Sequence, residues 1–597
     1  MESIKGLKRT RYCGEFRPEH IGERAVVFGW VQRMRNLGGL IFVDLRDRTG
    51  VVQCTFDEAV HKELFDRAFT VRSEFVLAIA GTVRSRGEAA INDRMPTGGV
   101  EIFADELRIL SKANTTPFEI VEDSDVNDTL RLKYRYLDLR RPDMQRTIAL
   151  RHRIAKIARD YYDENGFYEI ETPILTKSTP EGARDYLVPS RVHPGKFYAL
   201  PQSPQQYKQL LMVAGFDRYM QITRCFRDED LRADRQPEFT QIDLEMSFVD
   251  VEDVLAVNEG FIARLFREIH GIELPTPFLR MPYAEAMARF GSDKPDMRFG
   301  YELCDISEIV KNTEFKVFSG AIAAGGSVRL INVKDGGAKY KRKEIDALGE
   351  FVKTYRAKGL AWMKFTGGEM TSSFAKFLSE QEIEGIKKAA DAGENDLLLV
   401  VADAKDAVVF AALGALRCEC ARHMDVIRKD DYKILWVTDF PLFEYDEEAE
   451  RFVAMHHPFT SPRDEDIDLL ETQPEKVCAK AYDIVINGSE AGGGSIRIHD
   501  SEVQKKMFRA LGFTPERAQE QFGHMIEAFS FGAPPHGGLA FGLDRLVMLL
   551  SGRESIRDVI AFPKVQNASE LMMASPDVVD AAQLHELHIA LDLPEQD

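Results

Sequence analysis

The chain contains 597 residues, of which 44% are hydrophobic and 29% are charged, and its formal net charge is −19 at pH 7. This length exceeds what one hydrophobic core usually serves, so we expect about three or four domains. No apolar run is long enough to cross a membrane and the N-terminus lacks the apolar stretch of a signal peptide, so we expect a cytoplasmic location. The seven cysteines are scattered without a paired Cys-x-x-Cys spacing, which argues against a disulfide framework or a zinc site.

The charge is unevenly distributed along the chain. Residues 1–50 hold ten Lys/Arg and six Asp/Glu, a surplus of positive charge within a strongly acidic protein. A locally basic N-terminal module could contact nucleic-acid phosphates while the remainder keeps the protein soluble. A charged, solvated surface explains these counts about as well.

Short β-rich runs follow one another from residue 23 to residue 56. "ERAVVFGWVQRMR", "GGLIFVDLRD" and "TGVVQCTF" are separated by Gly-containing turns, which predicts a small Greek-key barrel. In the middle run apolar and polar residues alternate, so Phe42 lies on the polar face with Arg35, Arg46 and Gln53 nearby. An exposed ring beside such donors suits stacking on an unpaired nucleotide, as in OB-type barrels. The alternative is a ring covered by a neighbouring loop.

Residues 112–145 form a polar connector that ends in "RLKYRYLDLRRPDM" and is predicted to be a hinge. A long helix follows, because apolar residues recur at helical spacing up to Tyr161 and Gly166 is placed to end it. The run "FYEIETPIL" is predicted to be a strand, and Pro173 within it suits an edge or an interface. The apolar residues of this helix and strand could pack either in the hydrophobic core of one chain or in a dimer interface.

Two alternating runs, "RYMQITRCFR" and "EFTQIDLEMSF", flank a loop at residues 228–238 that carries five acidic and two basic residues. If the strands pair antiparallel, Arg227 shares a polar face with Phe239, Asp243 and Glu245. Arginine can hold a phosphate, the ring can stack on a base, and Asp243 can accept from an ammonium group. The alternative is a surface hairpin with cross-strand ion pairs, which contribute little to stability.

Further candidates lie on either side of this hairpin. "TPEGARDY" and "ALPQSPQQYKQLL" supply Glu181, Ser203, Gln205 and Lys208, although a lone lysine is more often a surface residue. "MHHPFT" supplies two adjacent histidines, which point opposite ways on an extended chain and so make a poor metal pair. We expect one of them to line a pocket.

The C-terminal third contains a second set of polar candidates. In "AYDIVINGSEAGGGSIRIHD", Asp483 and Glu490 lie at the edge of a strand and turn and suit Mg²⁺ carried by a polyphosphate, while Arg497 is a cation on a polar face. In "GAPPHGGLAFGLDRLVMLL", small residues allow close approach to a ligand, and Arg545 falls in the first turn of a helix, where it suits a phosphate.

These stretches together resemble a known family. "FRDED…RQPEFTQIDLE", "GFYEIETPIL" and "GLAFGLDRL" resemble motifs 2, 1 and 3 of the class II aminoacyl-tRNA synthetases. "YLDLRRPD", "TPEGARDYLVPSR", "QSPQQYKQLL", "GSDKPD" and "HHPFTSP" narrow the resemblance to the bacterial-type aspartyl-tRNA synthetases. The resemblance spans nearly the whole chain.

The resemblance implies an α+β multidomain protein with an N-terminal OB-fold β-barrel, a class II antiparallel-sheet catalytic domain and an α/β insertion domain. "GSVRLINV", "KEIDALGEFVKTY" and "DLLLVVAD" independently indicate alternating strands and helices in the insertion. The implied boundaries are an anticodon-binding barrel at 1–112, a hinge at 113–145, catalytic segments at 146–288 and 429–562, the insertion at 289–428 and a C-terminal extension at 563–597.

The resemblance also implies a role for each site residue. Arg227, Arg545 and Glu490 would be catalytic. The aspartate site would comprise Glu181, Ser203, Gln205, Lys208, Arg227, Asp243, His456 and Arg497. The ATP site would comprise Arg227, Asp228, Glu229, Gln236, Phe239, Glu490, Gly542, Leu543, Asp544 and Arg545. Mg²⁺ would be held by Asp483 and Glu490, and the tRNA anticodon by Arg35, Phe42 and Gln53.

The implied reaction is aspartate–tRNA ligation. The enzyme would activate L-aspartate with ATP and transfer it to the 3′ end of tRNA(Asp), as a homodimer formed through motif 1. Lys208 and Arg497 around one carboxylate would favour aspartate over asparagine. Two alternatives stay open: a relaxed enzyme that also charges tRNA(Asn), which Leu37 weakly disfavours because relaxed members often carry histidine there, and an inactive OB-containing RNA-binding paralogue.

Overall fold

The computed structural model describes residues 2–122, 124–178, 183–231 and 235–593. The chain divides into two compact units, residues 1–152 with 555–578 and residues 153–554 with 579–597. The first unit therefore includes a segment from near the C-terminus, which begins within the stretch predicted to belong to the catalytic domain. None of the helices in the described ranges combines the length and the hydrophobicity needed to cross a bilayer.

The first unit contains the predicted barrel. Five strands close in the order β1-β2-β3-β5-β4. Ile41, Val43 and Leu45 are fully buried inside it, while Phe42 and Asp44 alternate with them on the outer face, as the sequence pattern predicted. The strands are β1 Arg24–Asn36, β2 Leu40–Asp47, β3 Gly50–Asp57, β4 Val76–Ser85 and β5 Val100–Ser111, with helix α1 Lys62–Phe69 between β3 and β4.

The hinge contains two short helices, α2 Asp128–Lys133 and α3 Arg135–Asp138. Arg135 is buried and donates hydrogen bonds to the carbonyls of Arg557 and Ile560, which joins residues 555–578 to the hinge. The long predicted helix follows as α4 Pro142–Glu164, and Gly166, with a φ of +78°, lies just beyond its end.

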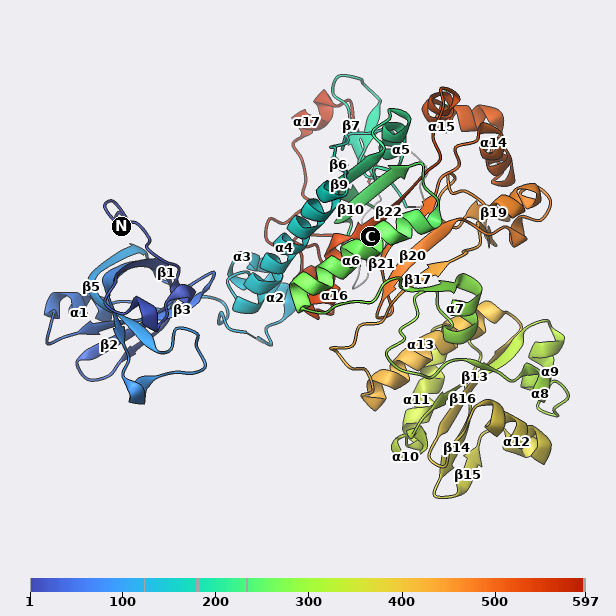
Figure 1. The fold of residues 1–597 in the computed structure, drawn as a ribbon, viewed down its shortest axis with the longest axis horizontal. Helices are drawn as coiled ribbons and strands as arrows, with labels where there is room; N and C mark the ends of the chain where they lie inside the picture. The colour runs from blue at the N-terminus through green and yellow to red at the C-terminus, as the bar shows by residue number, and fades with distance from the viewer. Residues whose placement is uncertain (1, 123, 179–182, 232–234, 594–597) are drawn as a thin grey trace. The chain divides into compact units, whose positions relative to one another are not determined.

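The second unit is built on an eight-stranded sheet in the order β11-β17-β20-β21-β22-β10-β9-β6 (Figure 1). Neighbouring strands are antiparallel except for the two outermost pairs. The strands are β6 Tyr168–Glu169, β9 Arg218–Phe226, β10 Glu238–Ser247, β11 Leu279–Pro282, β17 Ile434–Thr438, β20 Ala481–Ile486, β21 Ser489–Ile496 and β22 His536–Gly542. The antiparallel class II sheet implied by the resemblance is thus confirmed. Of the strand predicted at 167–175, only Tyr168–Glu169 forms, as the edge strand β6, and Pro173 lies outside it.

The two faces of this sheet differ in character. Phe541 of β22 pairs with Ile242 of β10, and its ring lies 5.2 Å from that of Phe261 in α6, so α6 covers the apolar face (Figure 1). Asp243 points to the opposite face, where it meets Lys208 of α5. That second face carries the polar residues. The helices of this region are α5 Gln205–Val213, α6 Val251–His270, α7 Tyr283–Phe290, α14 Ser501–Ala510, α15 Pro515–Ser530, α16 Leu543–Ser551 and α17 Ala581–Glu586.

Two small hairpins complete the region around the large sheet. The first pairs β7 Leu187–Pro189 with β8 Phe197–Ala199, and the second pairs β18 Phe443–Asp446 with β19 Arg451–Ala454.

The insertion forms a separate five-stranded sheet in the order β12-β13-β16-β14-β15. Its core includes Ile331, Leu399 and Leu416, all fully buried. The strands are β12 Cys304–Asp305, β13 Ser327–Val333, β14 Ala361–Thr366, β15 Glu369–Ser372 and β16 Leu397–Asp403; the helices are α8 Ser307–Val310, α9 Lys316–Ala323, α10 Gly336–Lys339, α11 Arg342–Lys353, α12 Glu380–Ala389 and α13 Asp406–Met424.

Candidate active site

A cleft of about 440 Å³ opens on the polar face of the eight-stranded sheet. Its walls come from α5, the β9–β10 hairpin, the segment after β19 and the strands β20 to β22. Residues as far apart in the sequence as Ser203 and Ala540 therefore meet at one place. The predicted residues that line it are Ser203, Gln205, Lys208, Arg227, Asp243, His456, Asp483, Glu490 and Arg497.

Four buried charges lie together at the cleft, and three of them, Lys208, Asp243 and Arg497, line it. The Lys208 Nζ lies 2.7 Å from Asp243 Oδ1 and 3.4 Å from Glu245 Oε2. The Arg497 guanidinium donates two hydrogen bonds to Glu245, at 3.0 and 3.1 Å. All four side chains are almost completely buried. Two cations and two carboxylates thus balance one another where water cannot screen them.

Glu245 is a residue that the site predictions did not include. The alternation of the "EFTQIDLE" run placed it on the polar face, but its pairing with Arg497, 252 residues away, carries no sequence signal. The resemblance implied that Lys208 and Arg497 clamp a substrate carboxylate, and the structure adds that Glu245 already pairs with both cations. Burial alone raises the pKa of Glu245, but Arg497 and Lys208 outweigh it and hold the pKa below its usual value.

Asp243 offers an acceptor to a ligand. Its Oδ1 accepts from Lys208, whereas its Oδ2 is buried and has no hydrogen-bond partner. Burial raises the pKa of this carboxyl despite the nearby Lys208. A buried oxygen without a partner is costly, so a donor from a bound ligand would be favoured there.

Both adjacent histidines line the cleft, whereas we expected one. The chain bends at Met455 and His456 and so does not follow the extended path that the prediction assumed. The His457 Nε2 accepts from Arg497 at 2.7 Å. The His456 Nδ1 is buried without a hydrogen-bond partner, and burial lowers the pKa of this ring to about 4. His456 is therefore neutral at physiological pH.

Three cations lie near the β9–β10 hairpin and Glu490, and of these three Arg227 lines the cleft. The Arg227 guanidinium lies 5.1 Å from the centre of the Phe239 ring. Arg545 donates a 2.6 Å hydrogen bond to the main-chain oxygen of Glu490 and lies 3.9 Å from its carboxylate. The Lys294 Nζ, which the site predictions did not include, lies 3.0 Å from the same carboxylate. Such an arrangement suits a polyphosphate.

Asp483 and Glu490 were predicted to hold a metal ion. A Cβ on Gly493 would lie 2.2 Å from Asp483 Oδ1 and 3.8 Å from Glu490 Oε1, so both carboxylates converge on this glycine. Burial and Glu490 raise the pKa of Asp483; burial raises that of Glu490, but Lys294 and Arg545 hold it below its usual value. Two hard oxygen donors fit Mg²⁺ that takes its other ligands from phosphate and water. No group of three or more His, Cys, Asp or Glu side chains suited to a metal occurs within the described ranges.

The other predicted nucleotide-site residues lie outside the lining of the cleft. Asp228 and Glu229 follow β9, where Glu229 accepts from Arg235. Gln236 is buried just before β10. Gly542, Leu543 and Asp544 begin α16, and the Asp544 carboxylate accepts from the backbone N–H of Thr240, which joins α16 to β10. Glu181 lies outside the described residues.

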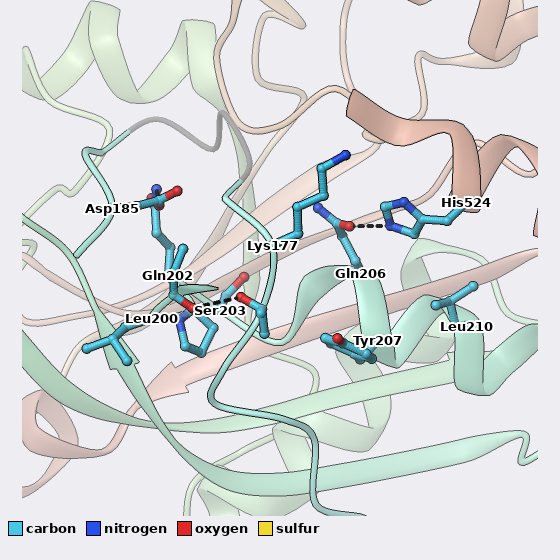
Figure 2. A pocket seen from close by; sticks show the side chains of 12 residues that line it. Lys177, Asp185, Leu200, Gln202, Ser203, Gln206, Tyr207, Leu210 and His524 are labelled. Carbon is cyan, nitrogen blue, oxygen red and sulfur yellow. Dashed lines mark hydrogen bonds between the residues drawn. The ribbon is translucent and has the colours of Figure 1, made fainter. Parts of the chain in front are cut away.

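A second cavity, of about 210 Å³, lies beside the cleft and shares Ser203 with it. Figure 2 shows Gln206 of α5 reaching His524 of α15, and their hydrogen bond measures 2.6 Å. Lys177 lines the same cavity. Polar and apolar side chains both line this cavity, and Ser203 is the residue that it shares with the cleft.

The three predicted anticodon residues lie together on the barrel. Arg35 donates to Gln53 at 3.0 Å, and its guanidinium lies 5.7 Å from the centre of the partly exposed Phe42 ring. Arg46, expected nearby on the open face, is instead buried and bonds to Glu74. The ring is thus partly exposed beside Arg35, as stacking on a base requires, whereas the Gln53 side chain is buried.

Comparisons with known proteins agree with this geometry. Residues 127–566 match the family described as tRNA synthetases class II (D, K and N), and residues 25–110 match the OB-fold nucleic acid binding domain. The chain is 64% identical to the aspartate–tRNA ligase of Ruminiclostridium cellulolyticum, over 99% of both chains. It is 59% identical to the aspartate–tRNA(Asp/Asn) ligase of Caldanaerobacter subterraneus subsp. tengcongensis, over 99% of this chain and 100% of the relative. In fold it resembles an asparaginyl-tRNA synthetase from Pyrococcus horikoshii, with a TM-score of 0.58 at 19% identity, over 93% of this chain and 98% of that one.

Proposed function

Because this chain belongs to the class II tRNA synthetases of the D, K and N group, we propose that its cleft activates L-aspartate with ATP and transfers it to tRNA(Asp). The observation that carries the proposal is the buried cluster of Lys208, Asp243, Glu245 and Arg497, which lies in one cleft with the carboxylates Asp483 and Glu490. A site for a small zwitterionic acid thus adjoins a site for a polyphosphate.

The cluster accounts for recognition of the amino acid. The unpartnered Oδ2 of Asp243 would accept from the substrate ammonium group. Lys208 and Arg497 would meet the side-chain carboxylate, with Glu245 holding both cations in place. Ser203, Gln205 and His456 line the remaining wall, and Glu181 would complete it. Asparagine, which brings no charge, gains less from the two cations.

Activation requires positioning and charge stabilisation and no protein nucleophile. Arg227 would hold the α-carboxylate against the α-phosphorus, to which that carboxylate adds as the bond to pyrophosphate breaks. Arg545 would bind the far end of the polyphosphate. Asp483 and Glu490 would hold Mg²⁺, which when bound supplies positive charge to the phosphates.

Transfer needs the terminal nucleotide of tRNA beside the activated amino acid. We place this nucleotide in the cavity of Figure 2, because Ser203 lines both cavities. The barrel would hold the anticodon through Arg35, Phe42 and Gln53. Replacement of the Figure 2 residues should then affect transfer and leave activation intact.

We also propose a homodimer through the edge strand β6. Tyr168 of β6 is exposed, as are Ile174 and Leu175 a few residues after it, and exposed large apolar side chains favour association. Size measurement of the purified chain by light scattering tests this, and a Leu175→Glu change should yield monomers. Because tRNA is charged where protein synthesis takes place, we propose the cytoplasm as its location.

A relaxed enzyme that also charges tRNA(Asn) is the second candidate. A relative at 59% identity is named for both tRNAs, whereas Leu37, an exposed residue at the end of β1, favours the strict enzyme. Equal charging rates on purified tRNA(Asp) and tRNA(Asn) would establish the relaxed form. An inactive paralogue is disfavoured, because Arg227, Arg545 and Glu490 are all present around one cleft.

The test of the main proposal is exchange of labelled pyrophosphate into ATP. Exchange should require aspartate and proceed without tRNA. Lys208→Met should abolish it, whereas Lys311→Met, an exposed lysine of the insertion, should not. Exchange with asparagine or lysine alone would contradict the proposed substrate.

A further inference from the structure

Lys294 lies against the two carboxylates proposed to hold Mg²⁺. Its Nζ is 3.0 Å from Glu490 Oε2 and 3.8 Å from Asp293 Oδ2. Arg545 approaches the same Glu490 carboxylate from Oε1. Asp483 lies beside Glu490 and is buried, so Lys294 supplies positive charge to a pair of carboxylates that would otherwise repel each other.

The insertion domain fixes the position of this lysine. Arg417 of α13 is buried and donates to the carbonyls of Asp296 and Gly300, both at 2.9 Å. A Cβ on Gly291, whose φ is +64°, would lie 2.4 Å from the Phe410 carbonyl, so the chain before Lys294 also presses on α13.

The chain after Lys294 presses on the large sheet. A Cβ on Gly488, in the turn between β20 and β21, would lie 2.9 Å from the Asp296 side chain. The segment that bears Lys294 is therefore held between the insertion helix α13 and the β20–β21 turn. The backbone that carries Lys294 is thus held in place, while its flexible side chain can still rotate the ammonium between neighbouring acceptors.

We propose that Lys294 neutralises Asp483 and Glu490 in the empty cleft and releases them to Mg²⁺ when the nucleotide arrives, its ammonium then turning to the polyphosphate. The inference rests on the proposed function, since it assumes the nucleotide site. The Lys294 ammonium, 3.0 Å from Glu490 Oε2, repels a second cation at the same carboxylate pair, so Lys294 and the metal ion compete for it. The insertion would thus set the order of binding, with Mg²⁺ entering together with ATP.

The experiment measures Mn²⁺ binding by electron paramagnetic resonance in the absence of nucleotide. Mn²⁺ replaces Mg²⁺ as the probe. The wild-type chain should bind it weakly at this site, and Lys294→Met should bind it at least tenfold more tightly, because the pair has lost its counter-charge. Lys294→Arg keeps the charge and should behave like the wild type, and Lys311→Met serves as the matched control.

Adding Asp483→Asn to Lys294→Met should remove the increase in Mn²⁺ affinity. Equal Mn²⁺ affinity in wild type and Lys294→Met, or a gain that survives the loss of Asp483, would overturn the inference. Aspartate-dependent pyrophosphate exchange by the wild-type chain is measured in parallel. If that exchange occurs and the Mn²⁺ gain does not, the role of Lys294 fails while the proposed function stands.

An independent feature of the N-terminal unit carries a second proposal. Arg9 and Arg48 of the barrel and Arg140 of the hinge line a cavity of about 310 Å³, together with Tyr12, Trp30 and the acidic residue Asp47. The guanidinium groups of Arg9 and Arg48 lie 4.6 and 4.8 Å from the centre of the Tyr12 ring. Neither forms an ion pair with any of the residues that the structure describes. Two guanidinium groups that lie close to the same aromatic ring create a positive potential that attracts an anion.

The position of this cavity indicates which anion. Trp30 pairs with Arg46 and Arg35 pairs with Phe42 along the same two strands, so the cavity continues the outer face that bears the anticodon residues. We infer that Arg9 and Arg48 bind phosphates of the tRNA backbone next to the anticodon. The inference rests on the proposed contact between the barrel and tRNA. Such phosphate contacts would increase the affinity for tRNA without distinguishing one nucleotide sequence from another.

The test is the salt dependence of tRNA binding. The logarithm of the tRNA association constant decreases linearly with the logarithm of the salt concentration. With Arg9→Gln and Arg48→Gln combined, this decrease should become less steep by about 1.4 to 1.8, which corresponds to the loss of two phosphate contacts. Arg9→Lys with Arg48→Lys should restore most of the slope, and Arg24→Gln, an exposed arginine paired with Asp105, should leave it unchanged. An unchanged slope in the double Gln variant would overturn the inference. Pyrophosphate exchange, which needs no tRNA, should be normal throughout.

Discussion

Replacing Glu245 with glutamine tests the buried charge cluster at the cleft. Glu245 accepts two hydrogen bonds from Arg497 and lies 3.4 Å from Lys208, with both cations buried. Removing one partner of a buried ion pair typically costs about 3–5 kcal/mol. Glutamine keeps one carbonyl acceptor, so we expect a loss near the lower end, about 3 kcal/mol of unfolding free energy.

Substrate should restore part of this loss. The variant cluster carries one excess positive charge, which the side-chain carboxylate of bound aspartate would compensate. Thermal unfolding of the Glu245→Gln chain should therefore occur at lower temperature than in the wild type, and saturating aspartate should stabilise the variant more than the wild type. Asparagine should give no such difference.

Glu471→Gln is the matched control, because Glu471 also accepts two hydrogen bonds from one arginine, Arg509, but on the surface. It should leave the unfolding temperature unchanged. The contribution of Glu245 is present at neutral pH and is lost as the pH falls through its lowered pKa, so variant and wild type should converge in acid. A Glu245→Gln chain that unfolds at the wild-type temperature at pH 7, or equal stabilisation of both chains by aspartate, would refute the reasoning.

Three further predictions concern the other parts of the molecule. Because burial lowers the pKa of His456 to about 4, kcat/KM for aspartate should show no His456 titration between pH 5.5 and 8; an inflection near pH 6.5 that His456→Gln abolishes would contradict this. Gln206→Ala and His524→Ala should slow transfer to tRNA at least tenfold in single-turnover assays with normal pyrophosphate exchange, and equal loss in both assays would argue against a separate site for the terminal nucleotide. Phe42→Ala should weaken tRNA binding by about 1–3 kcal/mol, the usual value of one base–aromatic stack, and unchanged filter binding would show that the ring does not stack.

Much of the fold follows from local patterns. The alternation in "GLIFVDLRD" placed Ile41, Val43 and Leu45 inside the barrel, because successive side chains of a strand point to opposite faces. The same rule placed Arg227, Phe239 and Asp243 on one face of the β9–β10 hairpin, and the observed register agrees. The remaining site residues were assigned through family resemblance, which carries information that a single chain's periodicity does not.

Sequence alone therefore determined the barrel, the polar hairpin face and the types of residue that face a ligand, since these depend on neighbours within a few positions. Only the tertiary structure decided that Glu245 compensates Arg497, that a bend turns both His456 and His457 into the cleft, and that Lys294 reaches Glu490. Ion pairs between residues some 200 positions apart leave no periodic trace, because their geometry is set by how whole strands and domains pack. The charge balance of the cleft is accordingly a property of the folded chain.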